Sequence, residues 1–245
     1  MIEIKHGLAP CPQTAYERFY AARTTEHELD YYLWLLRLLG LRAGERLLDV
    51  GCGEGALVRA VRARQVAAWG VDVARKALES AGGASGGDRA VVQADGERLP
   101  FPDRCFDVVT SVGSLEHYAD PERGAGELAR VLVPGGRALV LVPNTFGLLW
   151  TVKHALRTGE IFDDGQPIQR YGTRGEWERL LVRQGLRVAR VVGFDVPVRP
   201  QRVRSWLGLL VRPRTLGLTL IGRFLIPVNL ASCLVYLCRR EGGAG

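Results

Sequence analysis

Apolar and polar positions follow one another in short blocks, each with the spacing of a strand or a helix. Five blocks between residues 46 and 143 are continuous runs rich in valine and leucine. Such runs are typical of strands buried on both faces, as in a parallel sheet covered by helices. The predicted strands are 46–50, 67–73, 90–95, 106–112 and 137–143. The pattern therefore predicts an α/β fold with a largely parallel sheet.

Helices fill the gaps between these runs. The segments with helical spacing are 54–65, 74–81, 120–132 and 174–184. Asp120 is placed as an N-cap, with Pro121 at the first helical position. The stretch 173–176 has the sequence of a capping box, and Gly185 ends the helix that it opens. Two further strands are predicted at 186–194 and 232–240.

The two ends of the chain differ from this alternating core. Residues 24–40 have a threonine cap, acids in the first turn, apolar residues at helical spacing and Gly40 as a stop. The segment between the last two strands is apolar and dotted with arginines and prolines. We therefore expect a single domain with an N-terminal helical lid (1–45), a core (46–194), an apolar arginine-rich insert (195–231) and a last strand with a tail (232–245).

Composition places the chain among ordinary globular proteins. It has 245 residues, 47% hydrophobic and 24% charged, enough for one sizeable core. The N-terminus has no apolar run before a cleavage site, so we expect no signal peptide and a cytoplasmic protein. Five cysteines without a Cys-x-x-Cys pair indicate reduced, mostly buried thiols rather than a disulfide framework or a zinc site.

The net charge of +7 is concentrated at the C-terminal end. Residues 199–245 contain eight arginines and one glutamate, and the rest of the chain is neutral. The longest uncharged stretch there, 224–238, is shorter than the roughly 20 residues of a transmembrane helix, so we expect none. Three interpretations stay open: a solvated basic face, a cover over a pocket or a homodimer partner, and weak peripheral contact with an anionic membrane through 199–240.

A glycine-rich turn follows the first core strand in "RLLDVGCGEG" (46–55). Gly51, Gly53 and Ala56 fit the nucleotide fingerprint Gly-x-Gly-x-x-Gly/Ala, with Asp72 about 20 residues further on. Alone, this fingerprint also admits NAD. Asp49 argues against a dinucleotide, because a carboxylate about 5 Å from a pyrophosphate charge costs about 3 kcal/mol at an effective dielectric near 20. A ligand with an ammonium and a sulfonium, such as S-adenosylmethionine, makes the same interaction favourable.

Three acids stand at or near the carboxyl ends of three successive predicted strands. In an open parallel sheet, the ligand crevice lies at those ends. Beside Asp49, Asp72 is placed to accept hydrogen bonds from both ribose hydroxyls, and Asp95 from the adenine amino group. Each acid alone has another interpretation, as a helix cap or a turn residue. Together they favour a nucleoside that carries positive charge and no phosphate.

The chain resembles the class I S-adenosylmethionine-dependent methyltransferases over roughly residues 40–194. The similar segments occur in the family's order: "LLDVGCGEG", "GVDVARKAL", "QADGERLPFPDRCFDVVTS", "LEHYADPERGAGELARVLVPGGRALVLVPN" and "YGTRGEWERLLVRQGLRV". The branch most similar to it contains small-molecule enzymes of the ubiquinone and menaquinone type. The resemblance implies a Rossmann-like sheet of seven strands, mostly parallel, with helices on both faces and one antiparallel strand at the edge.

The resemblance also implies which residues contact the cofactor. The expected contacts are Asp49, Gly51 and Gly53 around the methionine part, Asp72 at the ribose, Asp95 and the Gly96 backbone at the adenine, and Ser111 and Val112 under the sulfonium. Cys52 and Val73 are further expected contacts with the cofactor.

On the acceptor side the candidates are fewer. His117, after the fourth strand, is the best-placed general base, and its alternative is a packing histidine. Glu116 beside it is interpreted as a solvated residue or a helix partner. Tyr20 is a second catalytic candidate, in a stripe with Tyr16 and Phe19 that is either a lid or a core face.

The stretch 144–170, with Tyr171 after it, is expected to shape the acceptor pocket. His154, Asp163 and Asp164 lie there without metal-ligand spacing, so we expect no metal.

Three hypotheses about function follow. The first is a methyltransferase that acts on the oxygen or carbon of a small, apolar or amphiphilic acceptor. The second is a protein of the same fold that binds S-adenosylmethionine without turnover. The third is an NAD-dependent oxidoreductase. No nucleic-acid partner is expected, because the basic residues are not interleaved with a nucleic-acid motif. The sequence leaves a homodimer open.

Overall fold

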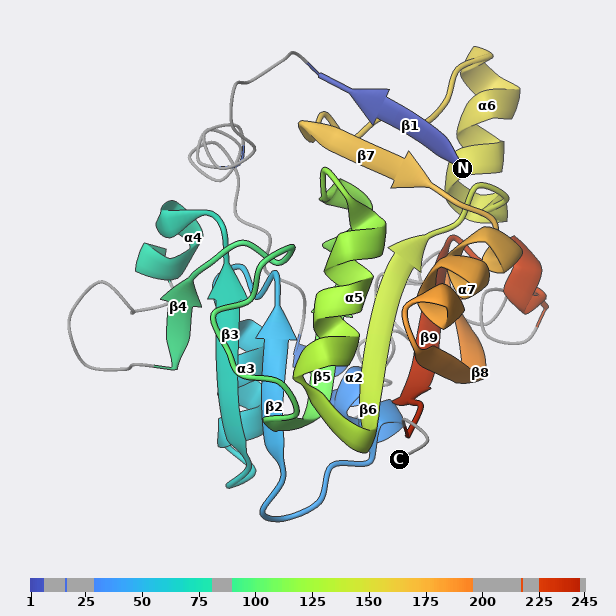
Figure 1. Cartoon of the computed structure of the whole chain (residues 1–245). Coiled ribbons are helices and arrows are strands. Elements are labelled where there is room, and N and C mark those ends of the chain that lie inside the picture. Colours follow the sequence, from blue (N-terminus) through green and yellow to red (C-terminus); the bar gives the residue numbers. More distant parts are fainter. Residues whose placement is uncertain (7–15, 17–28, 81–89, 196–216, 218–224, 243–245) are drawn as a thin grey trace.

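The computed structural model describes residues 1–6, 16, 29–80, 90–195, 217 and 225–242. Its centre is a seven-stranded sheet with the order β4-β3-β2-β5-β6-β9-β8 (Figure 1). The strands are β2 (Arg46–Val50), β3 (Ala67–Asp72), β4 (Val91–Gln93), β5 (Phe106–Val112), β6 (Leu132–Pro143), β8 (Leu186–Phe194) and β9 (Cys233–Arg240). The neighbouring pairs among β2 to β6 are parallel. This is the mostly parallel α/β fold that the sequence predicts.

The antiparallel strand is β9, which pairs with β6 on one side and β8 on the other. It therefore lies one position in from the edge, and β8 is the edge strand. The expectation of a reversed strand was right, and its exact placement at the edge was wrong. Because β9 is antiparallel to both neighbours, β8 runs in the same direction as β6.

Helices cover both faces of the sheet (Figure 1). They are α2 (Leu29–Leu39), α3 (Ala56–Arg62), α4 (Arg75–Ser80), α5 (Pro121–Val131) and α7 (Arg174–Arg183). The predicted start signals are present. The Asp120 side chain accepts a hydrogen bond from the N–H of Arg123 at 3.0 Å, and Thr173 and Glu176 form a reciprocal capping box. These caps satisfy N–H groups that have no partner inside the helix.

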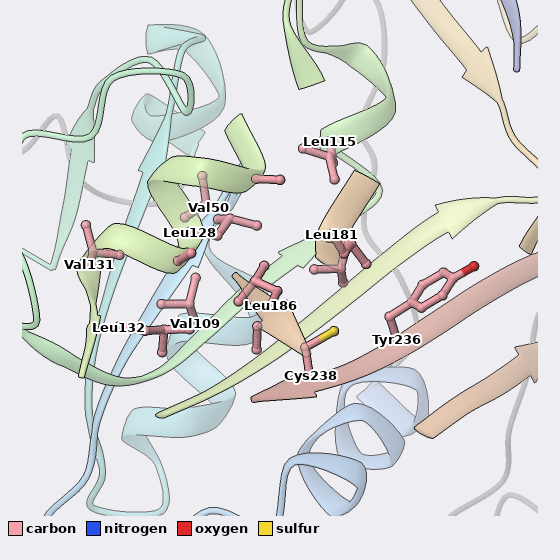
Figure 2. Close-up of a cluster of buried hydrophobic side chains, with 14 of the residues drawn as sticks. Val50, Val109, Leu115, Leu128, Val131, Leu132, Leu181, Leu186, Tyr236 and Cys238 are labelled. Carbon is pink, nitrogen blue, oxygen red and sulfur yellow. The ribbon is translucent and has the colours of Figure 1, made fainter. Parts of the chain in front are cut away.

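Two apolar layers hold the sheet between the helices. One layer joins α5 and α7 to the sheet, with Leu128, Leu132, Leu181 and Leu186 fully buried (Figure 2). The other joins α2 and α3 to the opposite face. Because both faces are covered, the strands can be apolar at every position, as the sequence pattern indicates.

A second, two-stranded sheet lies beyond the carboxyl ends of the parallel strands (Figure 1). In it β1 (Ile2–Lys5) pairs antiparallel with β7 (Ile168–Tyr171). Residues 2–5 were expected to belong to a helical region, and this is corrected here. A π-helical turn (Leu148–Val152) and α6 (Lys153–Thr158) connect β6 to β7. The small sheet places β7 directly beside the 3-10 turn η2 (Leu115–His117), which carries the candidate base.

Some expectations fall on residues that the structure does not describe. Residues 7–15 and 17–28 of the N-terminal lid, with Cys11, Phe19 and Tyr20 among them, lie outside the described part, as do residues 196–216 and 218–224 of the insert. The four cysteines within it are free, two buried and two half-buried. None of the described helices combines the length and the apolar character needed to span a bilayer.

Candidate functional site

Two cavities open at the carboxyl edge of the parallel strands. The larger has a volume of about 520 Å³ and extends from the glycine-rich turn toward β7, β8 and β9. The smaller, about 430 Å³, lies over the ends of β3 and β4. Both walls include Gly51, Gly113, His117 and Gln166. The two spaces therefore meet at the end of β5, where the resemblance places the reacting centre.

The glycine-rich turn between β2 and α3 requires glycine for conformation and for space. Gly51, Gly53 and Gly55 have φ values of 75°, 51° and 73°, which side-chain-bearing residues rarely adopt. A Cβ atom on Gly51 would stand 2.4 Å from the Cβ of Ser114. Ser114 is itself fixed, because its hydroxyl donates to the carbonyl of Val50 at 2.9 Å. At Gly51 the turn can therefore approach a ligand only through its backbone.

The smaller cavity has two of the predicted acids in its wall. Asp72, at the end of β3, is buried and accepts hydrogen bonds from the N–H of Gly53 (2.8 Å) and of Ala74 (2.9 Å). These two hydrogen bonds fix the carboxylate beside the glycine-rich turn, in the wall of the smaller cavity. Asp95 is exposed and accepts from the N–H of Glu97 at 2.9 Å. Both carboxylates thus face the space expected for a nucleoside.

Gly96 closes the far wall of the smaller cavity. A Cβ atom there would stand 2.1 Å from the hydroxyl oxygen of Tyr118, whose ring is also packed against Gly124. The Tyr118 ring therefore packs directly on the Gly96 backbone, and both residues line the smaller cavity.

Asp49 lies at the floor of the larger cavity and is 4% exposed. It accepts a hydrogen bond from the Thr110 hydroxyl at 2.6 Å. Burial and, to a smaller extent, the charge of Asp72 raise the pKa of Asp49 to about 7, against the lowering effect of the Thr110 hydrogen bond. Two carboxylates therefore repel each other here in the absence of a cation, and a positively charged ligand would relieve that repulsion.

His117 stands between the two cavities on η2. Its Nδ1 lies 2.6 Å from the carbonyl oxygen of Ile168, which can only accept, so Nδ1 carries the proton of the neutral ring. Nε2 then holds the lone pair that a base needs. Burial lowers the pKa of His117, with the Ile168 hydrogen bond opposing this. The ring is therefore neutral and its Nε2 is basic at neutral pH.

The interpretation of Glu116 as a solvated residue was wrong. Its side chain is buried, with the residue 4% exposed, and it lines the larger cavity. Its Oε1 lies 3.8 Å from Nε2 of His117, and its Oε2 has no hydrogen-bond partner. Burial raises the pKa of Glu116 to about 8. The pair is therefore held neutral at pH 7. Glu116 is buried because β7 lies against η2, where Arg170 donates to the Glu116 carbonyl at 3.4 Å.

Most of the other predicted cofactor residues lie in the cavity walls. Cys52 and Val112 line the larger cavity, and Val73 lines the smaller one. Ser111 is the exception, since it lines neither. It is fully buried, and its hydroxyl lies 2.8 Å from that of Ser114. On β5, successive side chains point to opposite faces of the sheet, so Ser111 and Val112 point to different faces.

Six aromatic side chains line the larger cavity. Its wall contains Tyr31, Tyr32, Trp150, Phe162, Tyr171 and Phe194. Of these, the sequence identified only Tyr171 individually, although Trp150 and Phe162 fall in the expected stretch 144–170. Tyr31 and Phe194 are 163 positions apart in the chain, yet their ring centroids are 5.3 Å apart. No local pattern could have paired them, because the sheet alone brings α2 beside the end of β8.

The remaining candidates have structural roles or lie outside the described residues. The Tyr16 hydroxyl donates to the carbonyl of His117 at 3.3 Å, and the ring lines the smaller cavity. Asp163 pairs with His6 at 2.6 Å, whereas Asp164 lines the larger cavity. Within the described ranges, no group of three or more His, Cys, Asp or Glu side chains could hold a metal ion.

The described walls fit a cationic nucleoside. The glycine turn excludes side chains, Asp49 and Asp72 are buried carboxylates, and neither cavity has a lysine or arginine among its described wall residues. A bound pyrophosphate would lie beside these two carboxylates, and no lysine or arginine of the described wall residues would offset their charge. The site therefore fits S-adenosylmethionine better than a dinucleotide.

Comparison with known proteins agrees with this geometry. Residues 48–140 match a family model described as a methyltransferase domain. A 27-O-demethylrifamycin SV methyltransferase of Amycolatopsis mediterranei is 42% identical over 124 residues, 46% of each chain. A demethylmenaquinone methyltransferase of Thermus thermophilus is 38% identical over 132 residues, 49% of this chain and 60% of that one. The chain thus spans about half the length of the curated relatives it matches.

Solved structures extend the similarity to most of the chain. An S-adenosylmethionine-dependent methyltransferase from Mesorhizobium loti has a TM-score of 0.60 at 21% identity and covers 85% of this chain and 98% of its own. The cyclase SpnF has the same TM-score and identity over 87% of this chain and 81% of its own. These likenesses show the fold. Because a cyclase shares it, the reaction must be argued from the site.

Proposed function

We propose that this chain, which carries a class I S-adenosylmethionine-dependent methyltransferase domain, transfers a methyl group to the oxygen or carbon of a small apolar or amphiphilic acceptor. The observation that carries the proposal is the junction of the two cavities at His117 and Gly113. The smaller cavity supports binding of the nucleoside, and the larger one continues past the glycine turn into an aromatic chamber. An acceptor in that chamber would lie next to the cofactor's methyl group.

When bound, S-adenosylmethionine supplies a methyl group activated on a sulfonium and leaves as S-adenosylhomocysteine. The chain's own contribution is mainly alignment, since holding two reactants in line can supply up to roughly 7–11 kcal/mol. Asp49 and the glycine turn would hold the methionine end, and Asp72 the ribose. Nε2 of His117 would take the proton that an acceptor hydroxyl or carbon loses, while Nδ1 stays bonded to Ile168.

Methyl transfer itself tests this proposal against binding without turnover. The protein is incubated with an extract of cells and S-adenosylmethionine labelled in its methyl group. We expect label in a small, organic-extractable product, and none with the His117→Gln variant at the same protein concentration. Cofactor binding without any labelled product would favour the non-catalytic alternative. Tight binding of NADH in a fluorescence titration would favour the oxidoreductase.

Replacing His117 by glutamine should slow transfer by about 10²–10⁴-fold, because the general base is lost. Glutamine can still donate to Ile168, so affinity for S-adenosylhomocysteine should stay within about threefold. The wild-type rate should rise with pH through a pKa below the usual histidine value, since burial lowers it and only the neutral ring accepts a proton. The variant should lack this rise. His154→Gln, on α6, is the control for the pH profile and should leave the rise with pH unchanged, because His154 lines neither cavity.

Affinity for S-adenosylmethionine should depend on pH through Asp49. In the empty site its pKa is about 7, and a cationic ligand favours the charged carboxylate, so binding releases a proton below that pH. Affinity should therefore rise from pH 5 to 7 and then level off. Calorimetry in buffers of different ionisation enthalpy measures the released proton. Asp49→Asn should abolish the pH dependence, and an unchanged slope in that variant would contradict the assignment.

We also propose weak contact with an anionic membrane through residues 199–240. Exposed apolar side chains in the described part of that region support it, with Leu225 73% and Leu230 38% exposed. Each arginine near such a surface contributes about 1 kcal/mol. Co-sedimentation with phosphatidylserine vesicles should exceed that with phosphatidylcholine vesicles and fall as salt is raised. Equal sedimentation with both would remove the proposal.

A further inference from the structure

The 3-10 turn that carries His117 is joined to β7 by one buried arginine. Arg170, the third residue of β7, is 5% exposed. Its Nη2 donates to the carbonyl of Ala119 at 3.2 Å, and its Nη1 donates to the carbonyls of Glu116, at 3.4 Å, and of Tyr118. One guanidinium therefore binds the backbone on both sides of His117.

The same guanidinium forms an ion pair with Glu3 of β1. Glu3 and Arg170 are directly opposite each other in the register of the small sheet, so their side chains are cross-strand neighbours. A buried charge without a partner is costly, and Glu3 supplies that partner. The two strands of the small sheet and η2 are thus linked through one side chain.

η2 has few hydrogen bonds of its own. Its turn is closed by bonds from the N–H of His117 to the Ser114 carbonyl, at 3.0 Å, and from the N–H of Tyr118 to the Leu115 carbonyl, at 3.4 Å. A single 3-10 turn is too short to hold one conformation by such bonds alone. The Tyr16 hydroxyl adds one contact, to the His117 carbonyl. The position of the turn therefore depends on its contacts with other elements.

The ring of His117 is bonded to the same strand as its backbone. Nδ1 lies 2.6 Å from the carbonyl oxygen of Ile168, two residues before Arg170. Ile168 orients the ring, whereas Arg170 holds the backbone that carries it. A displacement of about 1 Å near the reacting atoms can cost on the order of 10²-fold in rate, so the position of this backbone matters for proton transfer.

Arg170 is also one of the charged groups around the ring. Burial is the main cause of the lowered pKa of His117, and the charge of Arg170 adds to it. The Ile168 hydrogen bond and the charge of Asp164 act in the opposite direction. Glu116, whose Oε1 lies 3.8 Å from Nε2, is itself kept neutral by burial. Arg170 thus favours the neutral ring as well as its position.

We propose that Arg170 is the positioning residue of the general base: its bonds to the carbonyls on both sides of His117 hold Nε2 at the junction of the two cavities. Arg170 lines neither cavity, so it acts through His117 and not on a ligand. Three carbonyls and a carboxylate match the flat, five-donor guanidinium, and a lysine would keep the charge without this geometry. The inference rests on the proposed function, because it concerns the base of that same site.

Arg170→Lys tests the inference through the rate of transfer. With methyl-labelled S-adenosylmethionine and the cell extract as the source of acceptor, we expect a rate about 10–10²-fold below that of the wild type. In the His117→Gln background, assayed at higher protein concentration, the same substitution should cause no further loss, because the base through which it acts is already absent. An unchanged rate, or a loss of similar factor in both backgrounds, would overturn the inference.

NMR of isotopically labelled histidine ring nitrogens measures the positioning without any acceptor. In the wild type loaded with S-adenosylhomocysteine, the neutral ring of His117 should carry its proton on Nδ1, as the bond to Ile168 requires. In Arg170→Lys we expect both tautomers, as in free imidazole, because the ring is no longer held beside Ile168. The His117→Gln variant identifies the signals. A tautomer that stays unchanged in Arg170→Lys would contradict the inference.

Arg130→Lys is the matched control. Arg130, on α5, likewise donates to two carbonyls, those of Leu99 at 3.1 Å and Phe101 at 2.8 Å, and pairs with Asp103. It lines neither cavity and has no bond to η2 among the described contacts, so rate and tautomer should stay those of the wild type. Equal losses in the two lysine variants would show that the effect belongs to the fold and not to His117.

Glu3→Ala decides the question if Arg170→Lys does not fold, which a loss of S-adenosylhomocysteine binding would show. The Glu3 side chain is 37% exposed, so its removal weakens the ion pair and leaves the arginine in place. We expect the rate to fall about three- to tenfold, again only when His117 is present. Asp103→Ala, which removes the exposed partner of Arg130, is its control and should leave the rate unchanged. Unchanged transfer in Glu3→Ala would then reject the inference.

The wild type separates this inference from the proposed function. If it neither binds S-adenosylhomocysteine nor transfers label, or if His117→Gln transfers at the wild-type rate, the proposed function fails. If the wild type transfers label through His117 and the loss in Arg170→Lys does not depend on His117, only the role of Arg170 fails.

Discussion

Gly51→Ala is expected to reduce affinity for S-adenosylhomocysteine by about a hundredfold or more and to destabilise the fold by about 2–5 kcal/mol. The added Cβ would stand 2.4 Å from the Cβ of Ser114, and position 51 has a φ of +75°, which residues with a side chain rarely adopt. Ser114 cannot easily move, because its hydroxyl is bonded to Val50 and to Ser111. The turn must then leave the position from which its backbone contacts the cofactor. Calorimetry and thermal unfolding measure the two effects.

Gly44→Ala separates this steric effect from backbone strain. Gly44 also has a positive φ, +82°, but a Cβ atom there meets nothing within 4 Å. It precedes the same strand, β2, at the opposite end from the site. We expect only the cost of the left-handed conformation, about 1–2 kcal/mol of stability, with affinity unchanged. Similar losses of affinity in both variants would show that Gly51 matters for folding alone.

Asp72→Ala should weaken binding of S-adenosylhomocysteine by at least about tenfold. Hydrogen bonds to a charged group contribute about 1.5–3 kcal/mol each, and two ribose hydroxyls lose their acceptor. The variant also frees the N–H groups of Gly53 and Ala74, which the carboxylate holds at the turn. Asp72→Asn keeps one acceptor oxygen and should give an intermediate loss.

Asp107→Ala is the control for Asp72. Asp107 is the second residue of β5, at the amino end of the parallel strands and in neither cavity wall, where it accepts a hydrogen bond from the N–H of Arg46 at 2.9 Å. Its loss should lower stability slightly and leave affinity unchanged. Unaltered affinity in Asp72→Ala would disprove the ribose assignment.

The core and the cofactor edge were predictable because their signals are local. Continuous valine and leucine runs indicate doubly covered strands, and the strands at 46–50, 106–112 and 186–194 have the predicted bounds. The glycine turn follows β2 directly, and the acids lie at or near the carboxyl ends of their strands, so their common edge follows from parallel topology. The resemblance to class I methyltransferases is confirmed by the domain match and by the strand order.

The acceptor cavity could not be derived in the same way. Its wall combines α2, η2, β7 and the ends of β8 and β9, which are distant in sequence. Strand β1 has only four residues, and its partner β7 lies more than 160 positions away. From the sequence alone, without the pairing of β1 with β7, Glu116 is interpreted as a surface acid beside a histidine. The contact of β7 with η2 is what buries it and gives it a position in the site.

The most direct test of the central claim is a crystal structure with S-adenosylhomocysteine. The account predicts the ribose on the Asp72 carboxylate, the adenine between Asp95 and the Gly96 backbone, and the sulfur beside Gly113 and His117. The methionine end should lie over Gly51 with its ammonium toward Asp49. A crevice that stays empty at saturating ligand, or a ligand bound with these acids pointing away from it, would contradict the account.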